Sequence, residues 1–265
     1  MKKIFLTCSE KDIIDPAEVE HRVRGISLRF YSELASTQDT AKYVADKTTD
    51  KGIVIAAETQ TRGRGRFHRE WVSPEGGLWF SIIVYPQTKP EKSIQLSIVA
   101  AISVCRSLER IFKIKPLIKW PNDVIVKGKK VAGILTEMSY SADKLRWGVI
   151  GVGMNVNNPL PRSLRKEASN LKSVLKKRVN RTILLSEILK DLKTIYARFH
   201  GHGFGNFEKE FERRSVLNKK KVKIAESGRI YKGRVKKLEA DGSLLLEIAK
   251  DIRKKITGGT VLEYD

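Results

Sequence analysis

The residues best suited to chemistry lie in one short loop that alternates glycine with arginine. Residues 61–71 read TRGRGRFHREW and follow a strand-like segment at residues 52–58. Glycine lets the backbone bend sharply and approach a ligand, and arginine presents a planar, charged fork that suits phosphate and carboxylate oxygens. In an enzyme, such a loop is suited to fold over a nucleoside triphosphate. Taken alone, it fits a basic surface turn or a nonspecific nucleic-acid-binding segment equally well.

Composition narrows the class of protein. A chain of 265 residues with 41% hydrophobic and 31% charged residues predicts a globular protein with one large domain and a small one. The net charge of +22 favours anionic partners, which include nucleotides, acidic proteins and nucleic acid. Short lysine clusters, such as the one at residues 219–221, are predicted to be solvated faces.

The cysteines, the histidines and the apolar runs exclude several other classes. Cys8 and Cys105 are too few for a disulfide scaffold, and no cysteine or histidine spacing predicts a metal site. The apolar stretch at residues 4–6 is too short for a signal peptide. No apolar run approaches the roughly 18–20 residues that cross a bilayer. We therefore expect a cytoplasmic protein that makes no membrane contact.

Alternating strand-like and helix-like segments position the loop. Aromatic and β-branched residues at 78–85 predict a buried strand, and the apolar stripe of residues 92–112 predicts a long helix. Ser36 and Thr37 read as a helix N-cap, and residues 127–129 as a hairpin turn. Further strands are expected at residues 27–31, 117–120, 130–138 and 145–156, and further helices at residues 38–47, 182–199 and 207–216.

The pattern of the sequence changes after Asn218. Short alternating segments are separated by Ser-Gly, Asp-Gly and Gly-Gly, which predicts a small β-barrel. Its strands are expected at residues 221–225, 229–238, 243–248 and 261–264. The predicted organisation is an N-terminal extension at residues 1–25, a catalytic domain at 26–217 and a barrel at 218–265.

Further motifs narrow the interpretation of the arginine-glycine loop. Ser36-Thr37-Gln38 and Gln60 precede it, and a Lys-Trp-Pro-Asn-Asp run at residues 119–123, Lys130-x-x-Gly133 and Gly-x-Gly-x-Asn at residues 151–155 follow it. In this order and at these spacings, the set resembles the biotin–protein ligases from about residue 27 to the end. The resemblance implies an α/β (α+β) fold, in which a mixed, largely antiparallel sheet backed by helices forms a class II synthetase-like catalytic domain. A small SH3-like β-barrel follows it.

The resemblance also implies a two-step reaction. The carboxylate of biotin attacks the α-phosphate of ATP, which gives biotinyl-5′-AMP and pyrophosphate. A lysine of a biotin carboxyl carrier protein then attacks the activated carbonyl and releases AMP. Because the first step brings a carboxylate to a polyanion, it needs local positive charge and Mg²⁺, which is expected mainly on the ATP phosphates. The second step needs the mixed anhydride to be kept from water.

Biotin-binding residues are carried over from the family's motifs. Ser36, Thr37 and Gln60 match positions that hydrogen-bond the ureido ring, although a plain helix cap also explains the first two. Gln38 adjoins them and is expected to contribute through its backbone. The remaining matched positions, which line the biotin pocket or leave room for the ligand, are Arg64, Gly65, Arg66, Lys130 and Gly133.

Residues for the chemistry are assigned in the same way. Lys130 matches the reactive-site lysine that stabilises charge at the carboxylate and the α-phosphate, and Arg66 is expected to bind phosphate. Because neighbouring residues on a strand point to opposite faces, only one of Lys129 and Lys130 is expected to face the site. Asp123 is expected to orient or deprotonate the incoming lysine or to help hold the metal, with a turn-forming role as the competing interpretation. Lys130 and Arg66 also belong to the predicted ATP and adenylate set, which adds Arg64, Lys119, Asn122 and Asn155. Residues 158–171 resemble the loop that caps adenine.

Other interpretations remain to be separated. A lipoate ligase shares the fold class and the adenylation logic, and a nucleic-acid-binding protein would explain the charge and the loop. Only about 25 residues precede the catalytic region, so we expect a ligase without a DNA-binding repressor domain and no specific DNA binding. Trp71 is expected to anchor the base of the loop in the core. Homodimerisation is compatible with the sequence but is not fixed by it.

Overall fold

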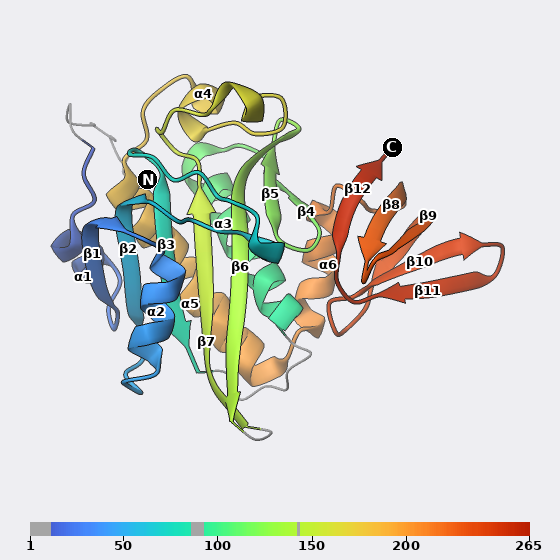
Figure 1. The fold of residues 1–265 in the computed structure, drawn as a ribbon, viewed down its shortest axis with the longest axis horizontal. Helices are drawn as coiled ribbons and strands as arrows, with labels where there is room; N and C mark the ends of the chain where they lie inside the picture. Colours follow the sequence, from blue (N-terminus) through green and yellow to red (C-terminus); the bar gives the residue numbers. More distant parts are fainter. Residues whose placement is uncertain (1–11, 86–92, 142–143) are drawn as a thin grey trace.

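A seven-stranded mixed sheet forms the centre of the molecule (Figure 1). The computed structural model describes residues 12–85, 93–141 and 144–265, so Cys8, Lys92 and the first 11 residues of the proposed N-terminal extension lie outside the described residues. Only the β1–β2 pair is parallel among the strand pairs of this sheet, which confirms the predicted largely antiparallel sheet. The strands follow the spatial order β1 (Ser27–Leu34), β2 (Ile53–Gln60), β3 (Leu78–Val84), β7 (Lys144–Met154), β6 (Lys129–Ser141), β5 (Asp123–Val126) and β4 (Leu117–Lys119).

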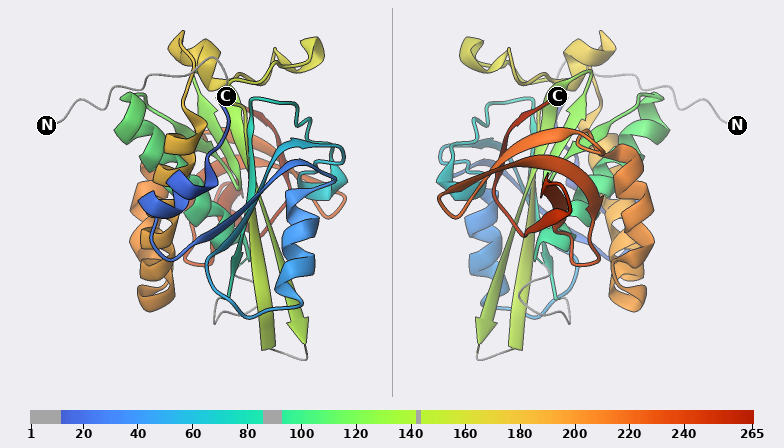
Figure 2. Two further views of the ribbon diagram at one scale, coloured as in Figure 1. Left: turned by 90° about the vertical axis from the view of Figure 1, so that its left-hand side faces the viewer. Right: turned by 90° about the vertical axis from the view of Figure 1, so that its right-hand side faces the viewer.

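Helices cover the two faces of this sheet unequally (Figure 2). The long helices α3 (Ser93–Phe112) and α5 (Arg181–His202) pack together on one face, with α6 (Gly205–Arg214) beside them. The short α2 (Thr37–Ala45) packs on the other face against β2, β3 and β7. The predicted helices are therefore confirmed within a few residues at each end.

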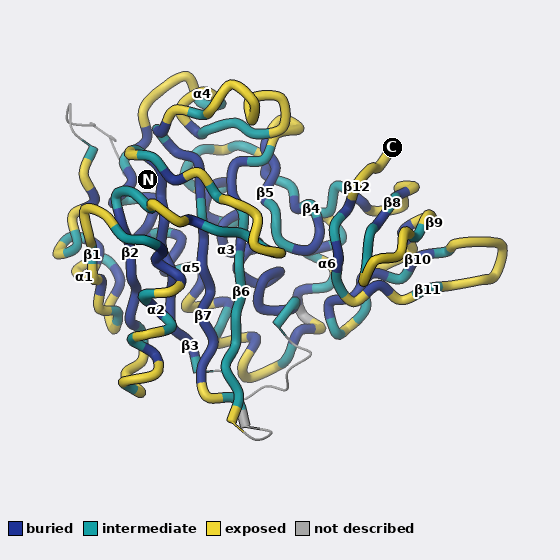
Figure 3. The backbone as a smooth tube through the Cα atoms, in the orientation of Figure 1, coloured by how far each residue is buried: buried dark blue, intermediate teal, exposed yellow. Residues whose placement is uncertain are grey.

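The buried residues form two layers, one on each face of the sheet. Figure 3 shows that the central strands β2 and β3 are largely buried. Phe80 and Ile82 of β3 belong to the large core under α3 and α5. Ile83 belongs to a smaller core with Ala41 of α2 and Val149 of β7. Because neighbouring residues on a strand point to opposite faces, the same strands that bury this core also present a second row of side chains to the α2 face.

The segment before residue 26 has more structure than the sequence suggested. Helix α1 (Pro16–Arg22) packs on α5 and β1, and Val19 is fully buried. Asp12 forms an ion pair with the buried Arg181 at 2.8 Å, and Arg181 also pairs with Glu58 at 2.7 Å. The prediction of an N-terminal extension at residues 1–25 did not include this helix, because seven residues rich in charge carry too short an apolar pattern.

The C-terminal residues form a separate five-stranded antiparallel sheet. Four of its strands were expected; the fifth, β11, has Arg-Lys-Lys between two isoleucines, and this run of charge hid it. Trp120 Nε1 of the main domain donates to the carbonyl of Gly242 at 2.9 Å, so the two parts are directly joined. The strands, in spatial order, are β11 (Ile252–Ile256), β10 (Leu244–Ala249), β9 (Arg229–Leu238), β8 (Lys221–Glu226) and β12 (Thr260–Tyr264). The domain boundary near residue 217 stays a prediction.

Candidate active site

A chain of neutral hydrogen bonds lies where α2 begins. The backbone N–H and the hydroxyl of Thr37 both donate to Gln60 Oε1, at 2.8 and 3.1 Å. The Thr37 hydroxyl also lies 3.0 Å from that of Ser81, which donates to Gln38 Oε1 at 3.1 Å. Gln60 Nε2 donates to the hydroxyl of Ser73 at 2.8 Å. Short hydroxyl and amide groups are thus held in fixed directions on the α2 face of the sheet.

Ser36 and Gln38 take different places in this arrangement. Ser36 is the N-cap of α2, and its side chain accepts a hydrogen bond from the N–H of Asp39, as the helix-cap interpretation predicts. Gln38 was expected to act through its backbone. That role stays a prediction. The buried side chain of Gln38 donates to the carbonyl of Val149 at 3.2 Å, so this side chain fixes α2 to the sheet.

Three glycines keep the neighbouring strands bare. Gly133 of β6 lies opposite Gly153 of β7 in register, and Gly151 follows on the same face. The indole of Trp71 lies over the first two: a Cβ on Gly153 would lie 2.5 Å from Nε1, and one on Gly133 would lie 3.0 Å from Cζ3. Gln38 lies over Gly151 in the same way. The glycines therefore let the indole of Trp71 and the side chain of Gln38 lie directly against the strands. We call this strip of three glycines the glycine trough.

Trp71, which was expected to anchor the base of the loop in the core, packs against the buried Trp79 and also lies beside Lys130. The ring is only partly buried, and its Nε1 is buried without a hydrogen-bond partner among the described residues. Lys130 Nζ lies 4.9 Å from the centre of the ring, and Trp79 meets its edge at 6.4 Å. Trp71 thus touches both the core and the site.

Arg64 is held by two acidic side chains at the side of the trough. It forms a two-pronged contact with Glu137 of β6, at 3.2 and 2.9 Å, and reaches Asp39 of α2 at 2.7 Å. Burial opposes ionisation of Glu137, but the hydrogen bonds and the charge of Arg64 outweigh it and hold the pKa of Glu137 below its usual value. Arg64 therefore links the loop to α2 and to β6.

Three cationic side chains from different parts of the chain converge on Asn122 and Asp123. Lys130 Nζ forms an ion pair with Asp123 Oδ1 at 2.6 Å. Arg66 Nη1 donates to Asn122 Oδ1 at 3.3 Å. Lys119 lies opposite Asp123 in the β4–β5 register. Asp123 thus faces three positive charges, Glu167 adds a second carboxylate near Lys119, and the cluster still has an excess of positive charge that suits an anion.

Burial affects the charges of this cluster. It lowers the pKa of Lys119 below its ordinary value; the charge of Lys130 adds to this effect, and that of Asp123 opposes it. Burial also lowers the pKa of Arg66, again against the attraction of Asp123. Desolvation and repulsion between like charges are both relieved when an anion binds. The two shifts therefore point to an anion-binding role.

The hairpin of β5 and β6 sets the direction of Lys130. Lys127 and Gly128 both have positive φ, at 49° and 76°, as a two-residue hairpin turn requires. Lys129 and Lys130 alternate across the strand, so Lys129 Nζ donates to the carbonyl of Arg165 at 2.7 Å, away from Asp123. The expectation that only one of the two lysines faces the cluster is confirmed.

Residues 158–171 are fixed beside Lys130 by backbone hydrogen bonds. The N–H of Lys130 donates to the carbonyl of Glu167, and the N–H of Ser169 donates to the carbonyl of Lys130, each at 2.9 Å. Asn155 is buried at the end of β7, and its Oδ1 accepts from Asn158 Nδ2 at 3.1 Å. The segment predicted to cap adenine therefore borders the cationic cluster.

The arginine-glycine loop also reaches the C-terminal sheet. Arg66 Nη1 donates to the carbonyl of Gly259 at 3.2 Å, and Arg69 Nη2 donates to the hydroxyl of Thr260 at the same distance. Between them, Phe67 and His68 have left-handed backbones, with φ of 56° and 57°. Neither residue is a glycine, so this turn is held under strain, and nothing in the sequence indicated these contacts.

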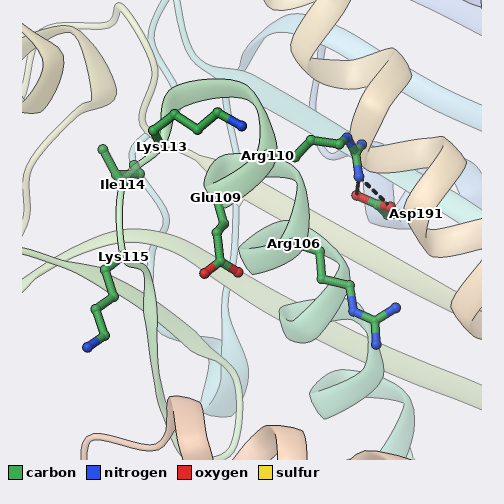
Figure 4. Close-up of a pocket in the computed structure, with 7 residues that line it drawn as sticks. All are labelled: Arg106, Glu109, Arg110, Lys113, Ile114, Lys115 and Asp191. Atoms are coloured by element: carbon green, nitrogen blue, oxygen red, sulfur yellow. Dashed lines mark hydrogen bonds and ion pairs between the residues drawn. The ribbon is translucent and has the colours of Figure 1, made fainter.

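A separate hollow of about 650 Å³ lies away from the site, at the C-terminal end of α3 (Figure 4). Its arginines are already paired. Arg110 contacts Asp191 at 2.9 Å, and Arg106 forms an ion pair with Glu210. Because carboxylates neutralise these cations, this hollow lacks the excess positive charge of the cluster around Lys130.

Sequence comparison agrees with this geometry. A model of the Biotin/lipoate A/B protein ligase family matches residues 19–155, a range that contains the hydrogen-bond chain, the glycine trough and the cationic cluster. The chain belongs to this family. Asn155 closes the matched range, and the C-terminal sheet that receives Arg66 lies beyond it.

The individual relatives of this chain are named as ligases, and some of the names specify biotin. The chain is 34% identical over 236 residues to the bifunctional ligase/repressor BirA of Bacillus subtilis, covering 88% of this chain and 73% of that protein. It is 38% identical over 128 residues to a biotin--[acetyl-CoA-carboxylase] ligase of Paracoccus denitrificans, which is 46% of this chain and 51% of that protein. The structure resembles the biotin protein ligase from Aquifex aeolicus in complex with biotin and ATP, with 30% identity, a TM-score of 0.75 and coverage of 90% of this chain and 97% of that one.

The structure brings most of the predicted site residues together in two groups. The neutral group comprises Thr37, Gln38 and Gln60, with Ser36 as the cap beside it. The charged group comprises Arg66, Lys119, Asn122, Asp123 and Lys130, with Asn155 behind the adjoining segment. Gly133 lies between the groups, Arg64 lies at the side in its contact with Glu137, and Gly65 lies in the loop, where a Cβ would meet only the carbonyl of Arg69 at 3.8 Å.

Sequence reasoning missed several side chains that complete the site. Ser81 joins Thr37 to Gln38, and Glu137 holds Arg64. A serine inside an otherwise apolar strand and a glutamate after an apolar run were the available signals. Thr260 had none, because its contact spans 191 residues of sequence.

Proposed function

We propose that this protein activates biotin with ATP to form biotinyl-5′-AMP and transfers biotin to a specific lysine of a biotin carboxyl carrier protein. The observation that carries the proposal is the convergence of Arg66, Lys119 and Lys130 on one carboxylate, beside a neutral hydrogen-bonding group. Family membership and the named biotin ligases of Bacillus subtilis, Paracoccus denitrificans and Aquifex aeolicus support the same reaction.

The neutral group suits the head of biotin. A ureido ring offers two N–H donors and one carbonyl, so it needs short hydroxyl and amide partners in fixed directions. Thr37, Gln60 and Ser81 provide such groups where α2 meets the sheet. The indole of Trp71, which lies against Gly133 and Gly153, then offers an apolar surface to a chain that leads toward Lys130.

The charged group suits the reacting atoms. Lys130 and Arg66 can offset the repulsion between the carboxylate of biotin and the α-phosphate, and they stabilise the charge that develops as the new bond forms. Asp123 lies 2.6 Å from Lys130 and can orient the incoming lysine once the adenylate has formed. Positive charge held in place before the reaction needs little rearrangement during it.

Mg²⁺ is compatible with this site. Among the described residues, no group of three histidines, cysteines or carboxylates forms a metal site of its own. Mg²⁺ commonly takes one or two carboxylates and completes its shell with water and phosphate oxygens, so Asp123 and Asn122 would suffice beside ATP. Bound there, the ion would neutralise phosphate charge.

Lipoate is the nearest alternative substrate, because the family model covers both kinds of ligase. The neutral hydrogen-bond chain favours biotin, since a dithiolane ring has no donors to use it. Titration calorimetry with biotin and with lipoate, each with and without ATP and Mg²⁺, tests the choice. We expect heat from biotin and none from lipoate. Preferential binding of lipoate would contradict the proposal.

The partner and the location follow from the same proposal. The carrier protein is expected to bind transiently, and the chain is expected to act in the cytoplasm. In the part of the chain that the structure describes, no helix has the length and apolar character to cross a membrane. The absence of repressor activity stays a prediction, and a homodimer is compatible with the proposal.

A further inference from the structure

A strongly cationic surface borders the charged group. Residues 159–179 contain seven lysines and arginines and a single acid, Glu167. All seven cationic side chains are exposed, and the hairpin turn adds the exposed Lys127 and Lys129. We call this set the cationic ridge. It comprises Lys127, Lys129, Arg162, Arg165, Lys166, Lys172, Lys176, Lys177 and Arg178.

The charge of the cationic ridge is not neutralised within the described residues. None of its nine side chains forms an ion pair there, whereas Arg106, Arg110 and Arg214 on the helical face all do. Lys127 and Lys129 donate to backbone carbonyls, which position the side chains and leave their charge in place. The ridge therefore presents net positive charge to the solvent.

The ridge is fixed next to the reaction centre. The two backbone hydrogen bonds between Lys130 and residues 167 and 169 tie it to the strand that carries the reactive lysine. The N–H of Leu171 donates to the carbonyl of Asn155 at 3.1 Å and ties it to β7. In Figure 1 the segment that includes α4 (Leu171–Leu175) lies above the ends of β5, β6 and β7. Leu164, 39% exposed, adds an apolar contact among the charges.

We propose that the cationic ridge is the docking surface for an acidic acceptor domain. This inference rests on the proposed function, which requires an acceptor lysine to reach the adenylate beside Lys130. A partner that bears carboxylates around its acceptor lysine would be guided to the ridge, so the lysine would arrive at the correct edge of the sheet. A second copy of this chain would be repelled there by its own ridge. A nucleic acid bound there would obstruct the acceptor.

Electrostatic guidance has a measurable size. Complementary charge raises association rates by about ten-fold to a thousand-fold, and salt removes the gain. The ridge should therefore affect kcat/KM for the acceptor and should not affect the adenylation of biotin. This separation allows the docking role to fail while the proposed function stands.

Charge reversal tests the docking role. The variant carries Lys172→Glu, Lys177→Glu and Arg178→Glu, which leave the hydrogen-bonded residues 167–171 unchanged. A matched control carries Arg198→Glu, Lys209→Glu and Arg213→Glu, which are exposed residues of α5 and α6 that form no ion pair among the described residues. Both variants change the net charge by the same amount. The acceptor is an acidic biotin carboxyl carrier domain, and a second form of it has its surface carboxylates changed to amides.

We expect the ridge variant to lose about ten-fold or more in kcat/KM for the acidic acceptor at low salt, and to lose most of its salt dependence. Biotin-dependent exchange of pyrophosphate into ATP should match the parent, which would show an intact fold and intact adenylation. The control should keep most of the acceptor rate, and the amide form of the acceptor should react equally with all three proteins. Equal loss in both variants, or no loss in the ridge variant, would overturn the docking role. A ridge variant that keeps its acceptor rate but no longer binds an oligonucleotide would also overturn the docking role. Loss of pyrophosphate exchange in the parent protein would instead refute the proposed function.

Discussion

The two ends of the candidate site satisfy their polar groups in different ways. At the neutral end, the side chains of Thr37, Gln60 and Ser81 find partners within the chain. At the charged end, Lys119, Arg66 and Lys130 share one carboxylate, and burial lowers the pKa of the first two. The neutral end is therefore complete as it stands, whereas the charged end gains stability when an anion arrives.

This difference separates recognition from reaction. A fixed set of hydroxyl and amide groups can select a small polar ring by its shape and by its pattern of donors. An excess of buried positive charge selects nothing by shape, but it stabilises any negative charge placed there. Changes at the charged end should therefore reduce the reaction rate, and changes near the neutral end should reduce the binding of biotin.

The largest expected effect comes from Lys130→Ala. Loss of this charge should slow biotin-dependent pyrophosphate exchange by about a hundred-fold to a thousand-fold, the range for removing one preorganised group that stabilises charge. The affinity for biotin alone should change much less. Lys129→Ala is the matched control, because its neighbouring side chain points away from Asp123. Near-normal exchange in Lys130→Ala would remove this lysine from the chemistry.

The second effect concerns the trough between the two ends. Gly153→Val places a branched side chain where its Cβ alone would lie 2.5 Å from Trp71 Nε1, so the indole must move. Overpacking of this kind costs about 1–3 kcal/mol, and we expect calorimetry to show biotin binding weakened by about ten-fold to a hundred-fold. Gly201→Ala is the control, since a Cβ there meets nothing within 4 Å. Unchanged affinity in Gly153→Val would show that biotin does not use the trough.

The smallest effect is a shift with pH. Because burial lowers the pKa of Lys119, its positive charge is lost at a lower pH than that of an ordinary lysine as the pH rises. Lys119→Arg keeps the charge, so the alkaline decline of kcat/KM for ATP should move to higher pH. Lys115→Arg, at an exposed position, should leave the profile alone. A variant that is active at neutral pH with the parent's alkaline decline would exclude Lys119 as the titrating group.

The two ends were also predictable from the sequence to different degrees. Local patterns were sufficient where the site depends on hairpins and caps: Ser36 caps α2, and the turn at residues 127–128 directs Lys130. Alternation along β6 correctly separated Lys130 from Lys129. These features depend on neighbours in the chain, which a sequence displays directly.

Contacts between distant segments were not predictable. The role of Trp71 depends on the register that sets Gly133 opposite Gly153, and the register of two paired strands cannot be read from the sequence. The ion pair between Asp12 and Arg181 joins residues 169 positions apart, so it was not predicted. Helix α1 in the proposed extension was not predicted either. Likewise, the side chain of Gln38 reaches the sheet because α2 packs across β7, a tertiary contact that no local pattern shows.

The bond from Arg66 to the carbonyl of Gly259 has a mechanical consequence. Gly259 accepts this hydrogen bond with its backbone oxygen. The bond is therefore lost only when the turn before β12 moves. The φ of Gly259 is 111°, and a Cβ there would collide with the carbonyl of Ala225, so this turn tolerates little but glycine. Tilting the C-terminal sheet would therefore either pull Arg66 away from Asn122 or break its bond to Gly259 and leave its bond to Asn122 in place.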